Sequence, residues 1–247
     1  MIALSYAEIA YCMVVLVASY ALRGSTGFGG FAAMPLLALV VPMKVLVPVW
    51  TLLTISSSAT LLGKDRRHIS PRLILRVVPT TVAGIGIGLY LFKTLDASWL
   101  AKGLGALVLA YGAWSFWKTL RPAETGGAAP RGISFVATVL AGAVGTVFGT
   151  MASLFYAVYL DAQRISKDQF RGTLSALMLI LAVIRGLGYF AVGEFGRESL
   201  ILFGAAVPLM LLGLFLGDRI HTGMTETTFR RVVCVILIVS GIPLLLK

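Results

Sequence analysis

Gly24-Ser25-Thr26-Gly27-Phe28-Gly29-Gly30 interrupts an apolar segment near the N-terminus, and Val144-Gly145-Thr146-Val147-Phe148-Gly149-Thr150 repeats the pattern in the second half of the chain. The two stretches align at a constant offset of 120 residues, which superposes Thr26, Phe28 and Gly29 on Thr146, Phe148 and Gly149. Glycine-broken apolar segments at matching positions of two halves are typical of repeat-built membrane carriers. If both lie at membrane depth, they are the expected place for a ligand to bind.

The composition indicates an integral membrane protein. Of the 247 residues 58% are hydrophobic and 13% charged, and the mean hydropathy is +0.94, so polar surface is too scarce to coat a soluble globule. The net charge of +11 lies in short loops between apolar segments, which favours a cytoplasmic-facing surface over nucleic-acid binding. Cys12 and Cys234 lie in apolar segments at opposite ends of the chain and are read as buried hydrophobes. No metal site and no cofactor is predicted.

Apolar blocks fill the chain, and the longest polar break, from Lys118 to Arg131, reads as a linker. The predicted organisation is an N-terminal repeat over residues 1–120, a linker over 121–131 and a C-terminal repeat over 132–247. Further matches support the duplication, because Gly88-Leu89-Tyr90-Leu91 resembles Gly213-Leu214-Phe215-Leu216. The blocks cover residues 5–22, 29–43, 45–63, 72–92, 98–117, 132–144, 149–160, 169–192, 198–217 and 227–246.

Block length and loop charge predict the topology. Blocks 132–144 and 149–160 would each form only about 15–18 Å of helix, roughly half of a 30 Å hydrocarbon core, which predicts a re-entrant hairpin. With a hairpin and three crossings per half, fourteen of the loop Lys and Arg residues fall on one side and five on the other; one crossing over 132–160 instead gives ten against nine. The positive-inside rule therefore favours two inverted-topology repeats with both termini outside. The predicted fold is all-α, with about eight hydropathy peaks and up to ten membrane segments.

The hairpin tips are the predicted anion site, because helices starting there would direct unpaired amides and positive dipole ends into the membrane centre. The acidic residues fall in predicted loops or near segment ends, which leaves the centre without carboxylates. Glycines that simply pack helices closely are the alternative. Arg23 and Arg185 are expected either to contact the ligand or to bond a hairpin carbonyl, and Arg171 to anchor the cytoplasmic end unless a cavity reaches it. The candidate site residues are Arg23, Ser25, Thr26, Gly27, Phe28, Gly29, Gly30, Thr146, Phe148, Gly149, Thr150, Arg171 and Arg185.

The run GSTGFGGFAAMPLLALVVP, with its second copy GTVFGTMASLFYAVYL followed by QFRGT, resembles the sulfite exporter TauE/SafE family of bacterial membrane transporters. The resemblance covers nearly the whole chain. It implies outward transport of small sulfur-containing or organic anions, such as sulfite or sulfoacetate, across the inner membrane. Thr150 stands where the first copy has Gly30, so the identity of the anion stays open.

Other classes of function have less support in the sequence. No catalytic motif is present, and His68 and His221 lie in basic loops, so an enzyme is not predicted. An anion channel and an accessory subunit of a larger membrane complex remain alternatives. The oligomeric state is open, with a homodimer among the choices.

Overall fold

The computed structural model describes residues 5–26, 33–65, 69–119, 131–161, 163, 165–219 and 226–247. All regular structure within these ranges is α-helical, which confirms the predicted all-α class. Within the described ranges, five helices are long and apolar enough to span a membrane, namely α1, α3, α4, α8 and α9. The helices are α1 (Tyr6–Thr26), α2 (Ala33–Ala38), α3 (Met43–Asp65), α4 (Pro71–Thr94), α5 (Ala97–Thr119), α6 (Arg131–Phe148), α7 (Ala152–Asp161), α8 (Lys167–Ala191), α9 (Arg197–Arg219) and α10 (Glu226–Leu246).

Capping side chains define the starts of two helices. At the beginning of α1, the Ser5 amide donates to Glu8 Oε2 at 2.7 Å and the Glu8 amide donates to Ser5 Oγ at 3.3 Å. This reciprocal pair is a capping box. At α8, Ser166 Oγ accepts from the Gln169 amide at 3.3 Å. Polar residues thus define the ends of helices whose interiors are apolar.

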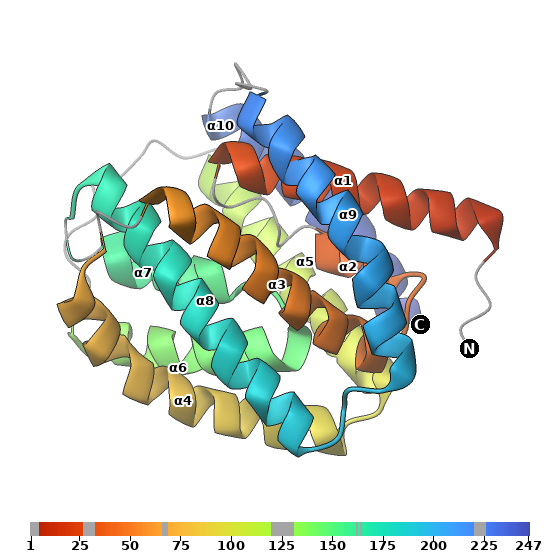
Figure 1. The fold of residues 1–247 in the computed structure, drawn as a ribbon, viewed down its shortest axis with the longest axis horizontal. Coiled ribbons are helices and arrows are strands. Elements are labelled where there is room, and N and C mark those ends of the chain that lie inside the picture. Colours follow the sequence, from red (N-terminus) through yellow and green to blue (C-terminus); the bar gives the residue numbers. More distant parts are fainter. Residues whose placement is uncertain are drawn as a thin grey trace.

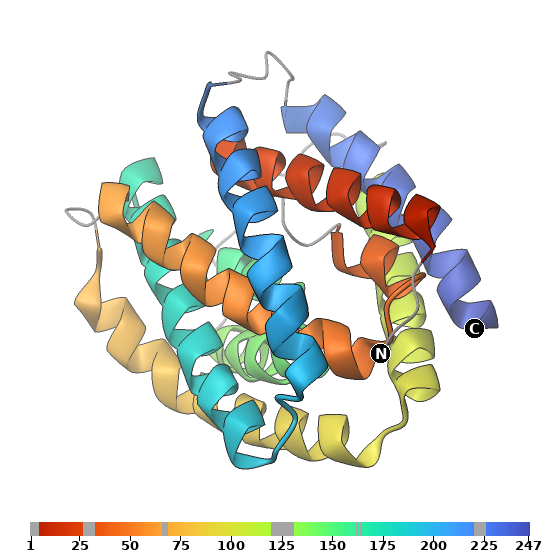
Figure 2. The same cartoon turned by 45° about the vertical axis from the view of Figure 1, so that its right-hand side comes forward.

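Helices of one half pack mainly on helices of the other. α1 packs on α9 and α4 on α6, while α3 pairs with α8 and α5 with α10. The helices α1 to α5 can be matched in order with α6 to α10. Replacing each helix by its match turns the α1–α9 pair into the α6–α4 pair and leaves the α3–α8 and α5–α10 pairs unchanged. Figures 1 and 2 show the result, with the warm-coloured first half interleaved with the cool-coloured second half.

Glycines allow two of these helix pairs to approach closely. A Cβ added at Gly84 of α4 would collide with the Val139 carbonyl oxygen of α6, and one at Gly217 of α9 would collide with the Ala21 carbonyl oxygen of α1. Small residues serve this purpose throughout membrane bundles, where backbone proximity replaces a hydrophobic driving force. The close-packing role weighed above for glycines is therefore met at these positions, and also at Gly24 of the first glycine-broken stretch, where an added Cβ would lie 2.8 Å from the Leu214 carbonyl oxygen of α9.

α3 and α8 run in opposite directions, as contacts at their ends show. Lys44, at the start of α3, lies 3.8 Å from Glu194, which follows the end of α8. At the start of α8, Thr173 Oγ1 accepts from the Ser70 amide at 3.1 Å, just before α4 begins. α3 and α8 are consequently antiparallel neighbours, whereas α4 runs parallel to α8.

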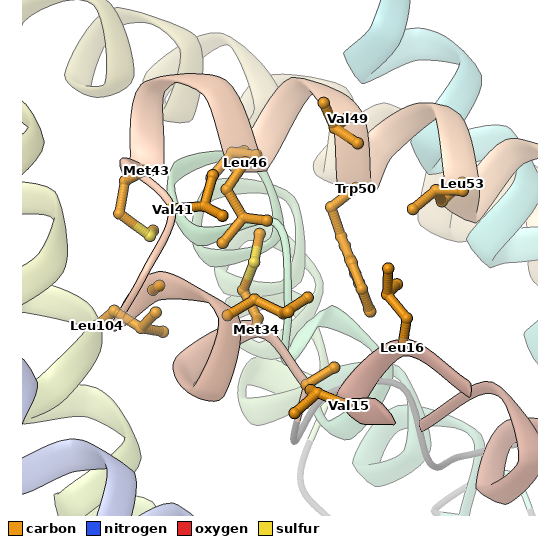
Figure 3. Close-up of a cluster of buried hydrophobic side chains, with 14 of the residues drawn as sticks. Val15, Leu16, Met34, Val41, Met43, Leu46, Val49, Trp50, Leu53 and Leu104 are labelled. Atoms are coloured by element: carbon orange, nitrogen blue, oxygen red, sulfur yellow. The ribbon is translucent and has the colours of Figure 1, made fainter. Parts of the chain in front are cut away.

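The core joins the first three helices. Trp50 extends from α3 toward Leu16 of α1, and Met34 of α2 points into the same cluster (Figure 3). The Trp50 ring lies 5.6 Å from that of Tyr20, centroid to centroid. This cluster holds Trp50 in place as one wall of the site described below.

Two predicted segment boundaries are wrong. The block ending at residue 144 continues as α6 to Phe148, so α6 is about 27 Å long rather than half a crossing. Gly145 therefore lies inside the helix and does not end it. A small residue is needed at this position, because an added Cβ would lie 2.8 Å from Ala152 Cβ. The block 29–43 contains only the six-residue α2 in its described part. Residues 27–32 and the linker before Arg131 lie outside the described residues.

Candidate functional site

The second glycine-broken stretch forms a buried interruption between α6 and α7. Gly149 has φ = +70° and Met151 φ = +65°, and both are buried, as is Thr150 between them. A left-handed conformation is uncommon for methionine and is kept only where the surroundings impose it. The backbone conformation at Gly149 favours glycine, whereas an added Cβ would meet only the Met34 methyl group, the movable end of a flexible side chain.

Side chains from α8 satisfy carbonyls that the interruption leaves open. The last four carbonyls of a helix have no partner within it. Arg185 donates from Nη1 to the Gly145 oxygen, and the Tyr189 hydroxyl donates to the Thr146 oxygen. A cation at this position also complements the negative end of the α6 dipole. Arg185 and Tyr189 are one turn apart, so a single face of α8 caps α6.

A cavity of about 50 Å³ lies where α7 begins. This is larger than the ~10–15 Å³ that one water molecule needs. The first turn of a helix presents free amides and a positive dipole end, so the start of α7 favours an anion. The lining comprises Arg23 of α1, Trp50, Thr54 and Leu61 of α3, Gly149 to Ser153 at the interruption, and Leu174, Ser175, Met178, Leu181 and Arg185 of α8.

Two buried guanidinium groups face this cavity. The exposed fractions of Arg23 and Arg185 are 9% and 2%. Arg23 Nη2 donates to Ser58 Oγ at 2.7 Å, while Nε of both arginines has no hydrogen-bond partner within the described structure. None of the described residues that line the cavity is acidic. Buried cations without a counter-charge are costly, so the arrangement is suited to a negatively charged ligand.

The structure brings only part of the predicted site together. Arg23, Gly149, Thr150 and Arg185 line the cavity. Arg185 also bonds the Gly145 carbonyl, which is one of the two roles weighed for it, and its contact with a ligand stays a prediction. Thr146 does not line the cavity; it is fully buried against Gly88 of α4, and its Oγ1 has no partner among the described groups.

Other predicted site residues point elsewhere or are not described. Phe148 packs toward Gly103 of α5, where an added Cβ would lie 3.1 Å from the Phe148 ring. Ser25 donates back to the Leu22 carbonyl at 3.2 Å. The backbones of Thr26 and Arg171 lie in α1 and α8, but their side chains are outside the described part, as are residues 27–30 including Gly27, Phe28, Gly29 and Gly30.

Several lining residues could not be found from the sequence. Trp50, Thr54 and Ser175 belong to helices whose apolar pattern gives no sign of which face meets the cavity. The Thr54 hydroxyl donates to the Trp50 carbonyl at 2.7 Å, as hydroxyls in membrane helices often do. Only the packing of α3 against α8 identifies this face.

Comparison with known proteins identifies the family of the chain. The family described as Sulfite exporter TauE/SafE matches residues 11–244. The chain belongs to this family. It is 28% identical over 184 residues to the "Probable inner membrane transporter protein TsaS" of Comamonas testosteroni, covering 74% of this chain and 75% of that protein. It is also 28% identical over 210 residues to the "Probable sulfite/organosulfonate exporter TauE" of Cupriavidus necator, covering 83% and 80%. No solved structure gives a significant match.

Membership of the TauE/SafE family and the apolar helices together establish the class of this chain. It is a multi-pass inner membrane protein of a transporter family, as predicted from the sequence. Both relatives are named as a transporter or an exporter rather than as an enzyme.

Proposed function

We propose that this TauE/SafE protein is a secondary transporter that exports a small sulfur-containing anion, sulfite or an organosulfonate, bound in the cavity between α1, α3, α7 and α8. The observation that carries the proposal is the meeting of two buried arginines with the start of α7 in a cavity whose described lining has no acidic residue. An oxyanion would supply the missing counter-charge and accept hydrogen bonds from the free Nε groups.

The carrier mechanism rests on two inverted repeats. The exchange-symmetric packing and the antiparallel course of α3 and α8 support it. In such folds one bundle moves against the other around a fixed central site. The proposed outward position of both termini also fits the end contacts, because Lys247 Nζ bonds the Ala38 and Leu39 carbonyls at 3.0 Å, on the segment that leads into Lys44.

The membrane potential is a sufficient driving force for export. With the inside negative, an anion moves outward with about 2.3 kcal/mol per charge per 100 mV. No coupled cation is then required. Binding has to be moderate, because a carrier must release its cargo.

The test is flux into proteoliposomes that contain the purified protein alone. Sulfite, sulfate, thiosulfate, taurine and sulfoacetate are compared for saturable uptake and counterflow. Arg185→Met and Thr150→Val, which change two residues that line the cavity, are expected to lower flux, while Arg197→Gln, a change of an exposed arginine at the start of α9, is the matched control. Flux without saturation or counterflow would indicate a channel, and no flux of any tested anion would favour an accessory subunit. Wild-type flux in both site variants would refute this cavity as the site.

A further inference from the structure

The face of α8 that lines the cavity continues beyond it. Leu174, Met178, Leu181 and Arg185 line the cavity at spacings of four, three and four residues, which is one face of a helix. The next residue on this face is Tyr189, which is fully buried and does not line the cavity. The open space therefore stops between Arg185 and Tyr189.

Aromatic rings cover Tyr189 on the side away from the cavity. The Phe92 ring of α4 lies 5.0 Å from the Tyr189 ring, and the Phe195 ring lies 6.4 Å away edge-on, both between centroids. Phe92 is fully buried as well. Ring contacts of this kind are individually weak, so the rings can separate.

A charged pair lies over the aromatic rings. Lys44 Nζ is 4.7 Å from the centroid of the Phe92 ring and 3.8 Å from Glu194 Oε1. It also donates to the Phe92 carbonyl and, at 3.3 Å, to the Lys93 carbonyl. The side chains of Lys44 and Glu194 are 28% and 21% exposed, so this layer is in contact with solvent.

The cavity extends the other way. Leu61, near the end of α3, and Leu174, near the start of α8, line it. Because α3 and α8 are antiparallel, both residues lie toward the end of the bundle opposite Lys44. The ion pair and the rings therefore lie between the cavity and one end of the helix bundle. The loop charges predict that this end faces outward.

We propose that Lys44, Glu194, Phe92 and Tyr189 form the outer gate of the anion path. Tyr189 is the positioning residue of this gate. Its ring packs against Phe92 and Phe195, and its hydroxyl donates to the Thr146 carbonyl, three residues before Gly149. Separation of the Lys44–Glu194 pair frees Phe92 and Tyr189 to move, and with them the end of α6. The inference rests on the proposed function, since the path it closes is that of the anion.

The gate is tested by thiol labelling with a membrane-impermeant maleimide. Val47 is fully buried and its side chain faces Gly149, so Val47→Cys in a Cys12→Ser, Cys234→Ser background reports access past the gate. Thr51→Cys, also at a fully buried position, is a second reporter. Labelling of Arg197→Cys, an exposed position at the start of α9, identifies whether spheroplasts or inverted vesicles present the gated side.

Glu194→Gln is expected to raise the labelling rate of the reporters from that side about two- to fivefold, the range for a partly exposed ion pair. The charge-swapped pair Lys44→Glu with Glu194→Lys is expected to return the rate toward that of the wild type. Lys102→Gln, which changes a cation stacked on Trp99 of α5, is the control. Unchanged labelling in Glu194→Gln, or equal acceleration in the Lys102 control, would overturn the gate.

The role of Tyr189 needs a separate readout. Sulfoacetate is expected to change the labelling rate of Val47→Cys when Tyr189 is present, and Tyr189→Phe is expected to abolish this response. A response that survives in Tyr189→Phe would remove the positioning role. Labelling in the absence of sulfoacetate requires no anion. If Glu194→Gln raises the labelling rate but the purified protein transports none of the tested anions, the proposed function is refuted and the gate is supported.

Discussion

Replacing Arg23 with methionine separates ligand binding from structural support. The arginine is nine-tenths buried, and among the residues that the structure describes its guanidinium donates to the neutral hydroxyl of Ser58 at 2.7 Å. Desolvating a charged group costs several kcal/mol, whereas a hydrogen bond to a charged group contributes only about 1.5–3 kcal/mol. Arg23→Met keeps most of the side-chain volume, so the ligand-free protein is expected to be as stable as the wild type or more stable.

The anion complex is expected to respond in the opposite direction. Loss of one charge-assisted contact, about 1.5–3 kcal/mol, raises the Kd about 10- to 150-fold. At an anion concentration of 100 times the wild-type Kd, the wild type gains about 2.7 kcal/mol of stability. A variant whose Kd is raised a hundredfold gains only about 0.4 kcal/mol at that concentration.

Thermal unfolding of the purified protein in detergent, with and without sulfoacetate, measures both quantities. Ser58→Ala is the matched variant, because it removes the same hydrogen bond but leaves the buried charge, and it is expected to destabilise the protein while keeping the anion-induced shift. If Arg23→Met lowers the unfolding temperature as much as Ser58→Ala and retains the full shift with sulfoacetate, Arg23 supports the structure and does not bind the anion.

Two further predictions concern the scaffold. Gly84→Ala places a methyl group against the Val139 carbonyl and is expected to destabilise the α4–α6 pair by roughly 1–3 kcal/mol, whereas Gly86→Ala, with open space around its Cβ position, is expected to be neutral or slightly stabilising; unfolding temperatures in detergent compare them. Tyr189→Phe removes the bond to the Thr146 carbonyl and is expected to cost about 1–3 kcal/mol, because a buried acceptor loses its partner; an unchanged unfolding temperature would show that this bond contributes nothing.

The sequence predicted what depends on composition and on chain punctuation. The long apolar blocks became helices because backbone groups in a membrane must be satisfied within the segment. The predicted position of the interruption differs from the observed one by a few residues. A glycine that allows close packing, such as Gly145, cannot be distinguished in sequence from a glycine that adopts φ > 0, such as Gly149. The pairing of Lys44 with Glu194 could not be predicted, because it depends on which helices are neighbours.

The charges of the site do not follow the symmetry of the scaffold. Arg23 lies in the last turn of α1, but the residue 120 positions later, in α6, is Ala143, and the second half contributes Arg185 from α8 instead. A binding site that was symmetric under exchange of the halves would present the same charge to both ends of the path. Here both arginines line a cavity that extends toward Leu61 and Leu174, while the opposite end is closed by rings and an ion pair. The helix pairings are therefore repeated on exchange of the halves, whereas the two arginines come from α1 and α8, which are not counterparts in that exchange.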